Sequence, residues 1–232
     1  YDISRQQAAR ADVELPDWDT LHRDGFVKIP APDKPTVMLQ EFRADPLAHP
    51  LATPSGKIEI FSQTIASFNY DDCPGHPVWL EPLEWLGHAA PGQLHMISNQ
   101  PRNKLHSQLD HGSVSRADRV TGREPMMMHP TDAVARGLEQ GQIVRVHNAR
   151  GACFAELRLS DEIRPGVIQL ATGAWYDPEG ETCLHGNPNT LTPDKGTSRL
   201  AQGPIAHSCL VSVEAVTGEI PATKAHLPPE IL

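Results

Sequence analysis

Short runs of β-type sequence, separated by turn signals, dominate the chain from residue 94 onward. Pro165-Gly166 is typical of a type II turn, and Asn148-Ala149-Arg150-Gly151 predicts a hairpin turn with Gly151 at a positive φ. One short helix is expected over 131–136, ended by Gly137. Six short strands, one helix and long loops predict a closed β-barrel of about 120 residues. The expected strands cover 94–99, 126–129, 143–148, 153–159, 167–171 and 209–216.

The chain before residue 93 is irregular, with short helical and strand patterns between Pro-rich segments. Helices are expected over 5–11, capped by Ser4, and over 18–24, capped by Asp17 and ended by Gly25. Strands are expected over 36–42 and 57–62. The fold class is therefore mainly β with short helices, a six-stranded barrel preceded by an irregular α/β segment.

Composition and charge exclude several classes of function. The formal net charge of −9 argues against a general nucleic-acid or anionic-membrane binder. No apolar run approaches the ~18 residues of a membrane span. The four cysteines form no C-x-x-C pair, so neither a zinc ribbon nor a redox dithiol is expected. The chain begins at Tyr1 without Met or a secretory signal, which suggests a processed or excised chain.

The densest group of polar residues lies at 98–108, directly after an expected strand, where binding residues often gather. Arg102 and Lys104 can hold a phosphate, and the neighbouring Asn, Gln and Ser side chains can bind a polar heterocycle. A solvated basic loop is the alternative interpretation. Between residues 94 and 123 only Asp110 and Asp118 oppose five basic residues. A basic island in an acidic protein favours a bound anion, or a surface that meets an acidic partner domain.

Two further polar segments lie at 185–192 and 197–203, where Gly and Pro predict loops. Asn187 and Asn189 could bind the edge of a base or of a pterin, or they could form local Asx turns. The twelve histidines show no H-x-x-x-H or H-E-x-x-H spacing, so no metal site is predicted. The usual hydrolase and dinucleotide motifs are missing from the sequence.

Several motifs, in order, resemble the molybdopterin oxidoreductases of the dimethyl sulfoxide reductase family. The match runs over about 53–215, and it is most similar to the biotin sulfoxide and trimethylamine N-oxide reductase branch. Gln142 departs from the pattern, since the family commonly has Asp there. The matching strings include Thr53-Pro54-Ser55-Gly56-Lys57, Gln100-Pro101, Leu105-His106-Ser107-Gln108, Gly122-Arg123-Glu124-Pro125, Gly173-Ala174-Trp175-Tyr176, His185-Gly186-Asn187-Pro188-Asn189-Thr190 and Gly196-Thr197-Ser198-Arg199-Leu200-Ala201-Gln202-Gly203.

The resemblance implies the C-terminal part of a longer enzyme, because family members are several times longer and carry the molybdenum ligand in an N-terminal region. It implies a double-psi β-barrel that closes over bis-molybdopterin guanine dinucleotide with molybdenum. The reaction of the intact enzyme would be two-electron oxygen-atom transfer from an S-oxide or N-oxide, and the chain alone would be inactive. The implied division is a remnant of the preceding α/β region (1–92), the cofactor-binding barrel (93–216) and a C-terminal tail (217–232).

The resemblance implies cofactor-binding residues but no catalytic and no metal-ligating residue in this chain. Gln100 and His106 are expected nearest the pterin, and Arg102 is expected at a phosphate, where Lys104 could substitute. One contact set comprises Ser98, Asn99, Gln100, Pro101, Arg102, Leu105, His106, Ser107 and Gln108. A second set comprises Asn187, Asn189, Gln202 and Gly203.

The expected partners are the N-terminal part of the same enzyme, an S-oxide or N-oxide substrate and an electron donor, with no nucleic acid and no membrane span. The resemblance implies a bacterial protein and leaves a cytoplasmic or a periplasmic location open. One alternative is a non-catalytic double-psi barrel that serves as an interaction module. Another is a fragment of a related formate dehydrogenase or nitrate reductase. The Leu105-His106-Ser107-Gln108 string favours the oxide reductases.

Overall fold

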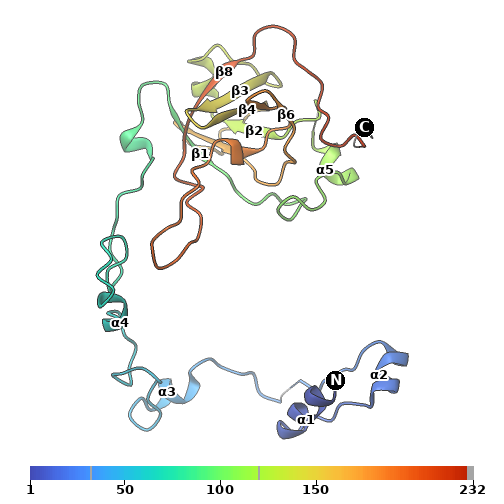
Figure 1. Cartoon of the computed structure of the whole chain (residues 1–232), viewed down its shortest axis with the longest axis vertical. Helices are drawn as coiled ribbons and strands as arrows, with labels where there is room; N and C mark the ends of the chain where they lie inside the picture. The colour runs from blue at the N-terminus through green and yellow to red at the C-terminus, as the bar shows by residue number, and fades with distance from the viewer. Residues whose placement is uncertain (32, 120, 229–232) are drawn as a thin grey trace. The chain divides into compact units, whose positions relative to one another are not determined.

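The computed structural model describes residues 1–31, 33–119 and 121–228 (Figure 1). The chain forms two compact units, residues 1–60 and 61–232, each described below by itself. Among the described residues, no helix combines the length and the apolar character that crossing a bilayer requires.

The unit 1–60 contains three short helices and, among its described residues, no strand. Asp17 caps the second helix by accepting a hydrogen bond from the Thr20 amide at 2.8 Å, and Gly25 ends it at φ 77°, as predicted. The helix predicted over 5–11 begins earlier and has no side-chain cap. The helices are α1 (Asp2–Arg10), α2 (Trp18–Asp24) and α3 (Gln40–Ala44).

Both strands predicted before residue 93 are wrong. Leu39 takes the left-handed conformation at φ 56° and precedes helix α3, so residues 36–42 build no strand. Local hydrogen bonds keep 53–59 in a turn: Thr53 Oγ1 donates to the Lys57 carbonyl at 2.6 Å, and Glu59 accepts from the Ser55 amide at 2.8 Å. Side chains that bond their own backbone compete in this way with a strand ladder.

The unit 61–232 contains the predicted barrel, closed by six strands (Figure 1). The strands neighbour one another in the order β2-β5-β1-β8-β3-β4, and a further pairing of β2 with β4 closes the ring. Two parallel pairings, β1–β5 and β2–β4, lie among antiparallel ones, as a double-psi barrel requires. The strands are β1 (Leu94–Ile97), β2 (Pro125–Met128), β3 (Ile143–Asn148), β4 (Gly151–Leu159), β5 (Val167–Leu170), β6 (Pro178–Glu179), β7 (Thr182–Cys183) and β8 (Leu210–Ala215).

Short helices and turns connect the strands. Helix α6 begins one residue before the predicted position because Pro130 occupies its first turn, and Gly137 follows it at φ 64°. Gly166 has the positive φ predicted for the Pro165-Gly166 turn. The helical segments are α4 (Gln63–Ala66), η1 (Leu86–His88), α5 (Ser113–Ala117), α6 (Pro130–Val134) and η2 (Pro188–Thr190).

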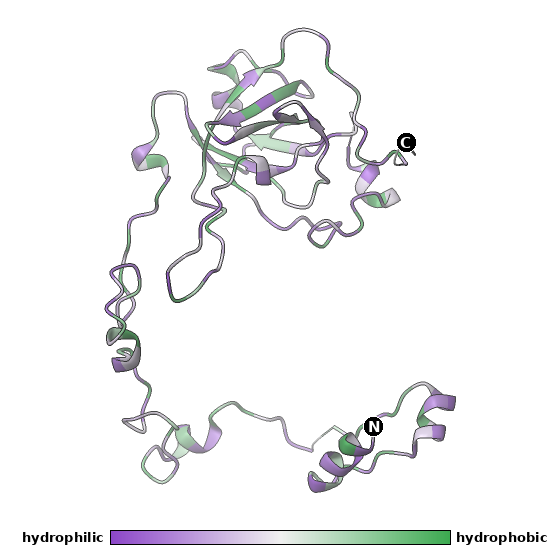
Figure 2. Ribbon diagram, in the orientation of Figure 1, coloured by the Kyte–Doolittle hydropathy of each residue, from purple (hydrophilic) through white to green (hydrophobic). Residues whose placement is uncertain are grey.

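The barrel interior is the hydrophobic core of this unit. Alternate residues of β1 and β2 are buried there, as the pleat of a strand requires, and Figure 2 shows both apolar and polar residues along the strands. Fully buried side chains from all six strands meet inside: Met96, Met126, Val144, Leu157, Ile168 and Val211.

Hydrogen exchange should separate the barrel from the N-terminal unit. We expect slow exchange at the amides of 143–146 and 167–170, which lie in buried barrel strands, and faster exchange before residue 50. The physical reason is that helices α1, α2 and α3 contain no buried residue. Mass spectrometry of peptides from the 232-residue chain provides the measurement, and equal protection in both regions would contradict the expectation.

Candidate functional site

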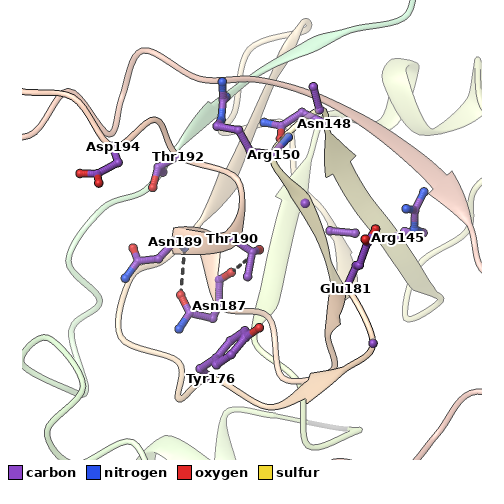
Figure 3. Close-up of a pocket in the computed structure, with 14 residues that line it drawn as sticks. Arg145, Asn148, Arg150, Tyr176, Glu181, Asn187, Asn189, Thr190, Thr192 and Asp194 are labelled. Carbon is purple, nitrogen blue, oxygen red and sulfur yellow. Dashed lines mark hydrogen bonds between the residues drawn. The ribbon is translucent and has the colours of Figure 1, made fainter.

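An open cavity of about 990 Å³ lies beside the β3–β4 hairpin (Figure 3). The hairpin turn contributes Asn148 and Arg150, and the segment around η2 contributes Asn187 and Asn189. Tyr176 lies below the two asparagines in this view. A cavity of this size can hold a nucleotide-sized ligand.

The hairpin turn differs from the prediction at Gly151, which has no positive φ. Asn148 Oδ1 instead accepts a hydrogen bond from the Arg150 amide at 2.9 Å and shapes the turn. The glycine is needed for another reason, because a Cβ at Gly151 would lie 2.9 Å from the Thr190 carbonyl oxygen. This close approach brings β4 and η2 together where Gly151 and Thr190 line the cavity.

The two arginines of the cavity are already paired with carboxylates. Arg150 contacts both oxygens of Glu84, at 2.5 and 3.0 Å, and these hydrogen bonds lower the pKa of Glu84. Arg145 Nη1 donates to Glu214 at 2.9 Å. The cavity therefore carries little uncompensated positive charge.

Asn187 and Asn189 differ in role: one forms a local turn, and the other is available to a ligand. Asn187 Oδ1 accepts a hydrogen bond from the Asn189 amide at 2.9 Å, which is the local turn considered as an alternative (Figure 3). In the part of the chain that the structure describes, the exposed Asn189 side chain has no protein hydrogen bond. Its amide is therefore free to bind a ligand.

The loop 98–110 is fixed to the segment 169–175 by several contacts. The Asn99 carbonyl accepts from the Thr172 amide at 3.0 Å, and the Ser107 carbonyl accepts from Trp175 Nε1 at 2.8 Å. Gly173 lies so close that a Cβ there would be 1.8 Å from the His106 carbonyl oxygen. Backbone carbonyls of the loop thus hold it in place, together with the side chains of Asn99 and Asp110, which bind Gln169 and the Trp175 amide.

The predicted contact residues of this loop differ in their availability. Gln100 donates to the Lys104 carbonyl at 2.6 Å and Asn99 accepts from Gln169, so both amides are partly used. His106 takes a positive φ of 51°, an uncommon conformation for a non-glycine residue. The exposed side chains are those of Gln100, Arg102, Leu105, His106, Ser107 and Gln108, whereas Ser98, Asn99 and Pro101 are half-buried.

The remaining predicted residues, Gln202 and Gly203, lie in a separate loop. The Gly203 carbonyl accepts from the Thr197 amide at 2.8 Å, and Gln202 donates to the Ser198 carbonyl at 3.1 Å. Neither residue lines the cavity that contains Asn187 and Asn189. The loop 98–108 also lies outside the cavity lining, so the predicted residues occupy three places in the structure.

A buried group of four charged residues, which we call the charge cluster, joins the loop 98–110 to Arg119 and Glu124. Lys104 Nζ donates to Asp110 at 2.9 Å and to Glu124 at 2.6 Å. Arg119 binds the same two carboxylates, contacting Glu124 at 2.8 Å. The side chains of all four residues are at most 6% exposed. The cluster corrects two expectations. Lys104 is unavailable to a phosphate, and two of the five local basic residues are paired internally with carboxylates.

Asp110 connects the charge cluster to two histidines distant in sequence. His185 Nε2 and His226 Nε2 lie 3.1 and 3.0 Å from its second carboxylate oxygen. Burial opposes ionisation, but hydrogen bonds from the histidines and from Arg119 and Lys104 hold the pKa of Asp110 far below its ordinary value. Sequence reasoning missed this group, because its members share no motif.

The trio of Asp110, His185 and His226 also offers three ligand atoms within 4.8 Å of one another. The same carboxylate, however, binds two cations on its other oxygen, Lys104 and Arg119. Positive charges this close oppose a divalent ion in a buried site. The geometry favours a hydrogen-bonded network.

Fold and site together define a β-barrel domain that presents polar loops and an open polar cavity to a ligand. Residues 94–210 match the family described as "Molydopterin dinucleotide binding domain", and the chain belongs to this family. The resemblance predicted from the motifs is thereby confirmed.

Curated relatives cover nearly the whole chain. Biotin sulfoxide reductase of Cereibacter sphaeroides is 48% identical over 94% of the chain, and dimethyl sulfoxide/trimethylamine N-oxide reductase of Rhodobacter capsulatus is 44% identical over 94%. Trimethylamine-N-oxide reductase 1 of Escherichia coli is 45% identical over 93%. The chain spans only 30%, 27% and 26% of the lengths of these three relatives.

A solved structure confirms the barrel fold independently of sequence. Acetylene hydratase from Pelobacter acetylenicus superimposes with a TM-score of 0.60 at 20% identity. The alignment covers 72% of this chain and 24% of that protein.

The donor set of the described residues fits a molybdopterin dinucleotide. Pterin and purine edges need paired donors and acceptors, which the free Asn189 amide and the exposed Gln108 amide supply. A diphosphate needs a cation, and Arg102 is exposed in the described structure without a protein carboxylate bound to it. The cavity has room for one end of such a molecule.

Proposed function

We propose that this chain is the cofactor-binding part of a molybdenum S-oxide or N-oxide reductase that holds bis-molybdopterin guanine dinucleotide. The observation that carries the proposal is the family match over 94–210, joined to relatives named as sulfoxide and N-oxide reductases. When bound, the cofactor supplies two-electron oxygen-atom transfer chemistry. The substrate would be an S-oxide or N-oxide, and an electron donor would restore the enzyme after each turnover.

The chain's own residues would bind and orient the cofactor. Arg102 would hold a phosphate, and Gln100 and His106 would lie nearest the pterin on the loop 98–110, with Gln108 in the same contact set. Asn187 and Asn189 would receive another part of a dinucleotide in the cavity. Gln202 and Gly203 would form a third contact. We place the barrel domain at 93–216, preceded by part of an α/β region that includes residues 1–92, and followed by the segment 217–232.

Two other functions remain as alternatives. A barrel that serves only as an interaction module has no need of a free cation in a fixed polar loop, so the exposed Arg102 favours cofactor binding. A formate dehydrogenase or nitrate reductase would bind a similar cofactor. The names of the similar relatives support the oxide reductases instead.

Replacing Arg102 with Ala in the complete enzyme tests the proposal. Loss of a charge-assisted contact worth roughly 1.5–3 kcal/mol should weaken cofactor binding by about tenfold to a hundredfold. Asn189→Ala removes neutral hydrogen bonds and should cost about 1 kcal/mol. The measurement is molybdenum and guanine nucleotide per mole of enzyme after dilution and gel filtration.

Arg164→Ala is the matched control, because Arg164 is likewise exposed and lies in the turn before β5, away from the predicted contacts. It should retain the cofactor of the unsubstituted enzyme. Full retention by both Arg102→Ala and Asn189→Ala, at unchanged release rates, would contradict the assignment of the two sites.

A further inference from the structure

The segment 221–228 lies against the barrel unit through contacts made mostly by its backbone. Asp177 Oδ2 accepts hydrogen bonds from the amides of Lys224 and Ala225, at 2.6 and 3.0 Å. The buried Arg123 donates to the Pro221 carbonyl. Figure 1 shows the segment returning from the end of β8 to the side of the barrel that carries α5. Two buried charged residues are thus used to hold one irregular segment.

His226 is the side chain that this segment inserts into the unit. Its Nε2 lies 3.0 Å from Asp110, and its ring meets those of Trp175 and His185 edge-on, with centroids 5.5 and 4.8 Å apart. The side chain is only 19% exposed. His226 therefore packs against Asp110 and Trp175 and covers both side chains on one side.

Asp110 and Trp175 in turn hold the loop 98–110. The Trp175 amide donates to Asp110 Oδ2 at 3.2 Å, and its indole donates to the Ser107 carbonyl at 2.8 Å. Asp110 also binds Lys104 of the same loop. Two residues within the loop, His106 and Leu109, take positive φ values of 51° and 65°. Such conformations persist where surrounding contacts determine the backbone.

We propose that the segment 221–228 is a clasp in which His226 positions the loop 98–110 through Trp175 and Asp110. The expected consequence is that the clasp sets how long the cofactor stays bound. This consequence rests on the proposed function. His226 is a positioning residue, since it contacts none of the predicted cofactor-binding side chains.

The first test uses the 232-residue chain and needs no cofactor. His226→Phe keeps an aromatic ring against Trp175 but removes the hydrogen bond to Asp110, whereas His226→Gln retains a donor. We expect His226→Phe to speed hydrogen exchange in peptides covering 103–110 by about tenfold, the effect of one hydrogen bond to a charged group. His226→Gln should exchange at nearly the original rate. Strand peptides over 143–148 should be unchanged in both variants.

Two further variants complete this test. Asp177→Ala releases the Lys224 and Ala225 amides without touching Asp110, and should also speed exchange in 103–110. Lys224→Ala removes only the exposed 3.4 Å contact with Glu179 and should have no effect. Unchanged exchange in 103–110 for both His226→Phe and Asp177→Ala would overturn the clasp. An equal rise in 103–110 and in 143–148 would also overturn it, because the effect would then be global destabilisation.

The second test measures release of molybdopterin guanine dinucleotide from the complete enzyme. His226→Phe should release it several-fold faster, and His226→Gln at nearly the original rate. Equal release by His226→Phe and the unsubstituted enzyme would overturn the proposed consequence. If the unsubstituted enzyme contains no such cofactor, the proposed function fails, whereas the exchange experiment still decides whether the clasp positions the loop.

Discussion

Replacing Asp110 with Asn should lower the free energy of unfolding by about 3–5 kcal/mol, because it leaves buried charges without their partner. Asp110 is fully buried, and Lys104 and Arg119 would share the single carboxylate of Glu124. The hydrogen bonds that both histidines make with Asp110 would also weaken. The measurement is guanidinium unfolding of the 232-residue chain followed by circular dichroism.

The control for Asp110 is Glu214→Gln, which removes the carboxylate from an exposed ion pair with Arg145. Exposed pairs contribute about 0–1 kcal/mol, so the midpoint of unfolding should hardly move. A loss below about 1 kcal/mol for Asp110→Asn would mean that the charge cluster is not a determinant of stability.

Gly173→Ala should destabilise the loop 98–110 more than any other glycine substitution in the barrel unit. The new Cβ would meet the His106 carbonyl oxygen at 1.8 Å, and backbone atoms cannot rotate away as a side chain can. Overpacking costs about 1–3 kcal/mol, and an unfavourable φ adds of order 1–3 kcal/mol. We therefore expect a loss of about 2–5 kcal/mol in unfolding free energy, with rapid hydrogen exchange in 98–110.

Gly141→Ala separates the two causes. Gly141 also has a positive φ, of 79°, but a Cβ there would meet nothing within 4 Å. Its substitution should show only the conformational cost, with exchange in 98–110 unaltered. Equal destabilisation by the two alanines would rule out the close approach at His106 as the cause.

The barrel was predictable because its strands have clear local signals. The strand over 143–148 was predicted with the observed bounds. Its apolar residues, its β-branched residues and the turn residues beside it all indicate a strand of this length. The strand expected over 36–42 failed because the described residues of its unit contain no strand to pair with it, and Leu39 precedes helix α3 instead. A local sequence pattern determines secondary structure weakly where the segment has no hydrophobic core to pack against.

The candidate site was only partly predictable. The polar loop at 98–108 was visible as a run of binding side chains, but the pairing of Lys104 with Glu124 depends on a fold that brings residues 20 positions apart together. The contacts of Asp110 with His185 and His226 span 75 and 116 positions. No spacing rule detects such contacts, whereas the Asn187 turn lies within two residues and was foreseen as an alternative.

The neighbours of β1 determine when the barrel can close during synthesis. β1 pairs with β5 and β8, both of which follow it, and β8 is also the antiparallel neighbour of β3. At elongation rates of about 5–20 residues per second, the interval between the end of β1 and the start of β8 is on the order of 10 s. Until β8 emerges, the edges of β1 and β3 that pair with it stay open, and open strand edges are templates for association with other chains. The nascent chain therefore stays exposed to association with other chains until β8 emerges.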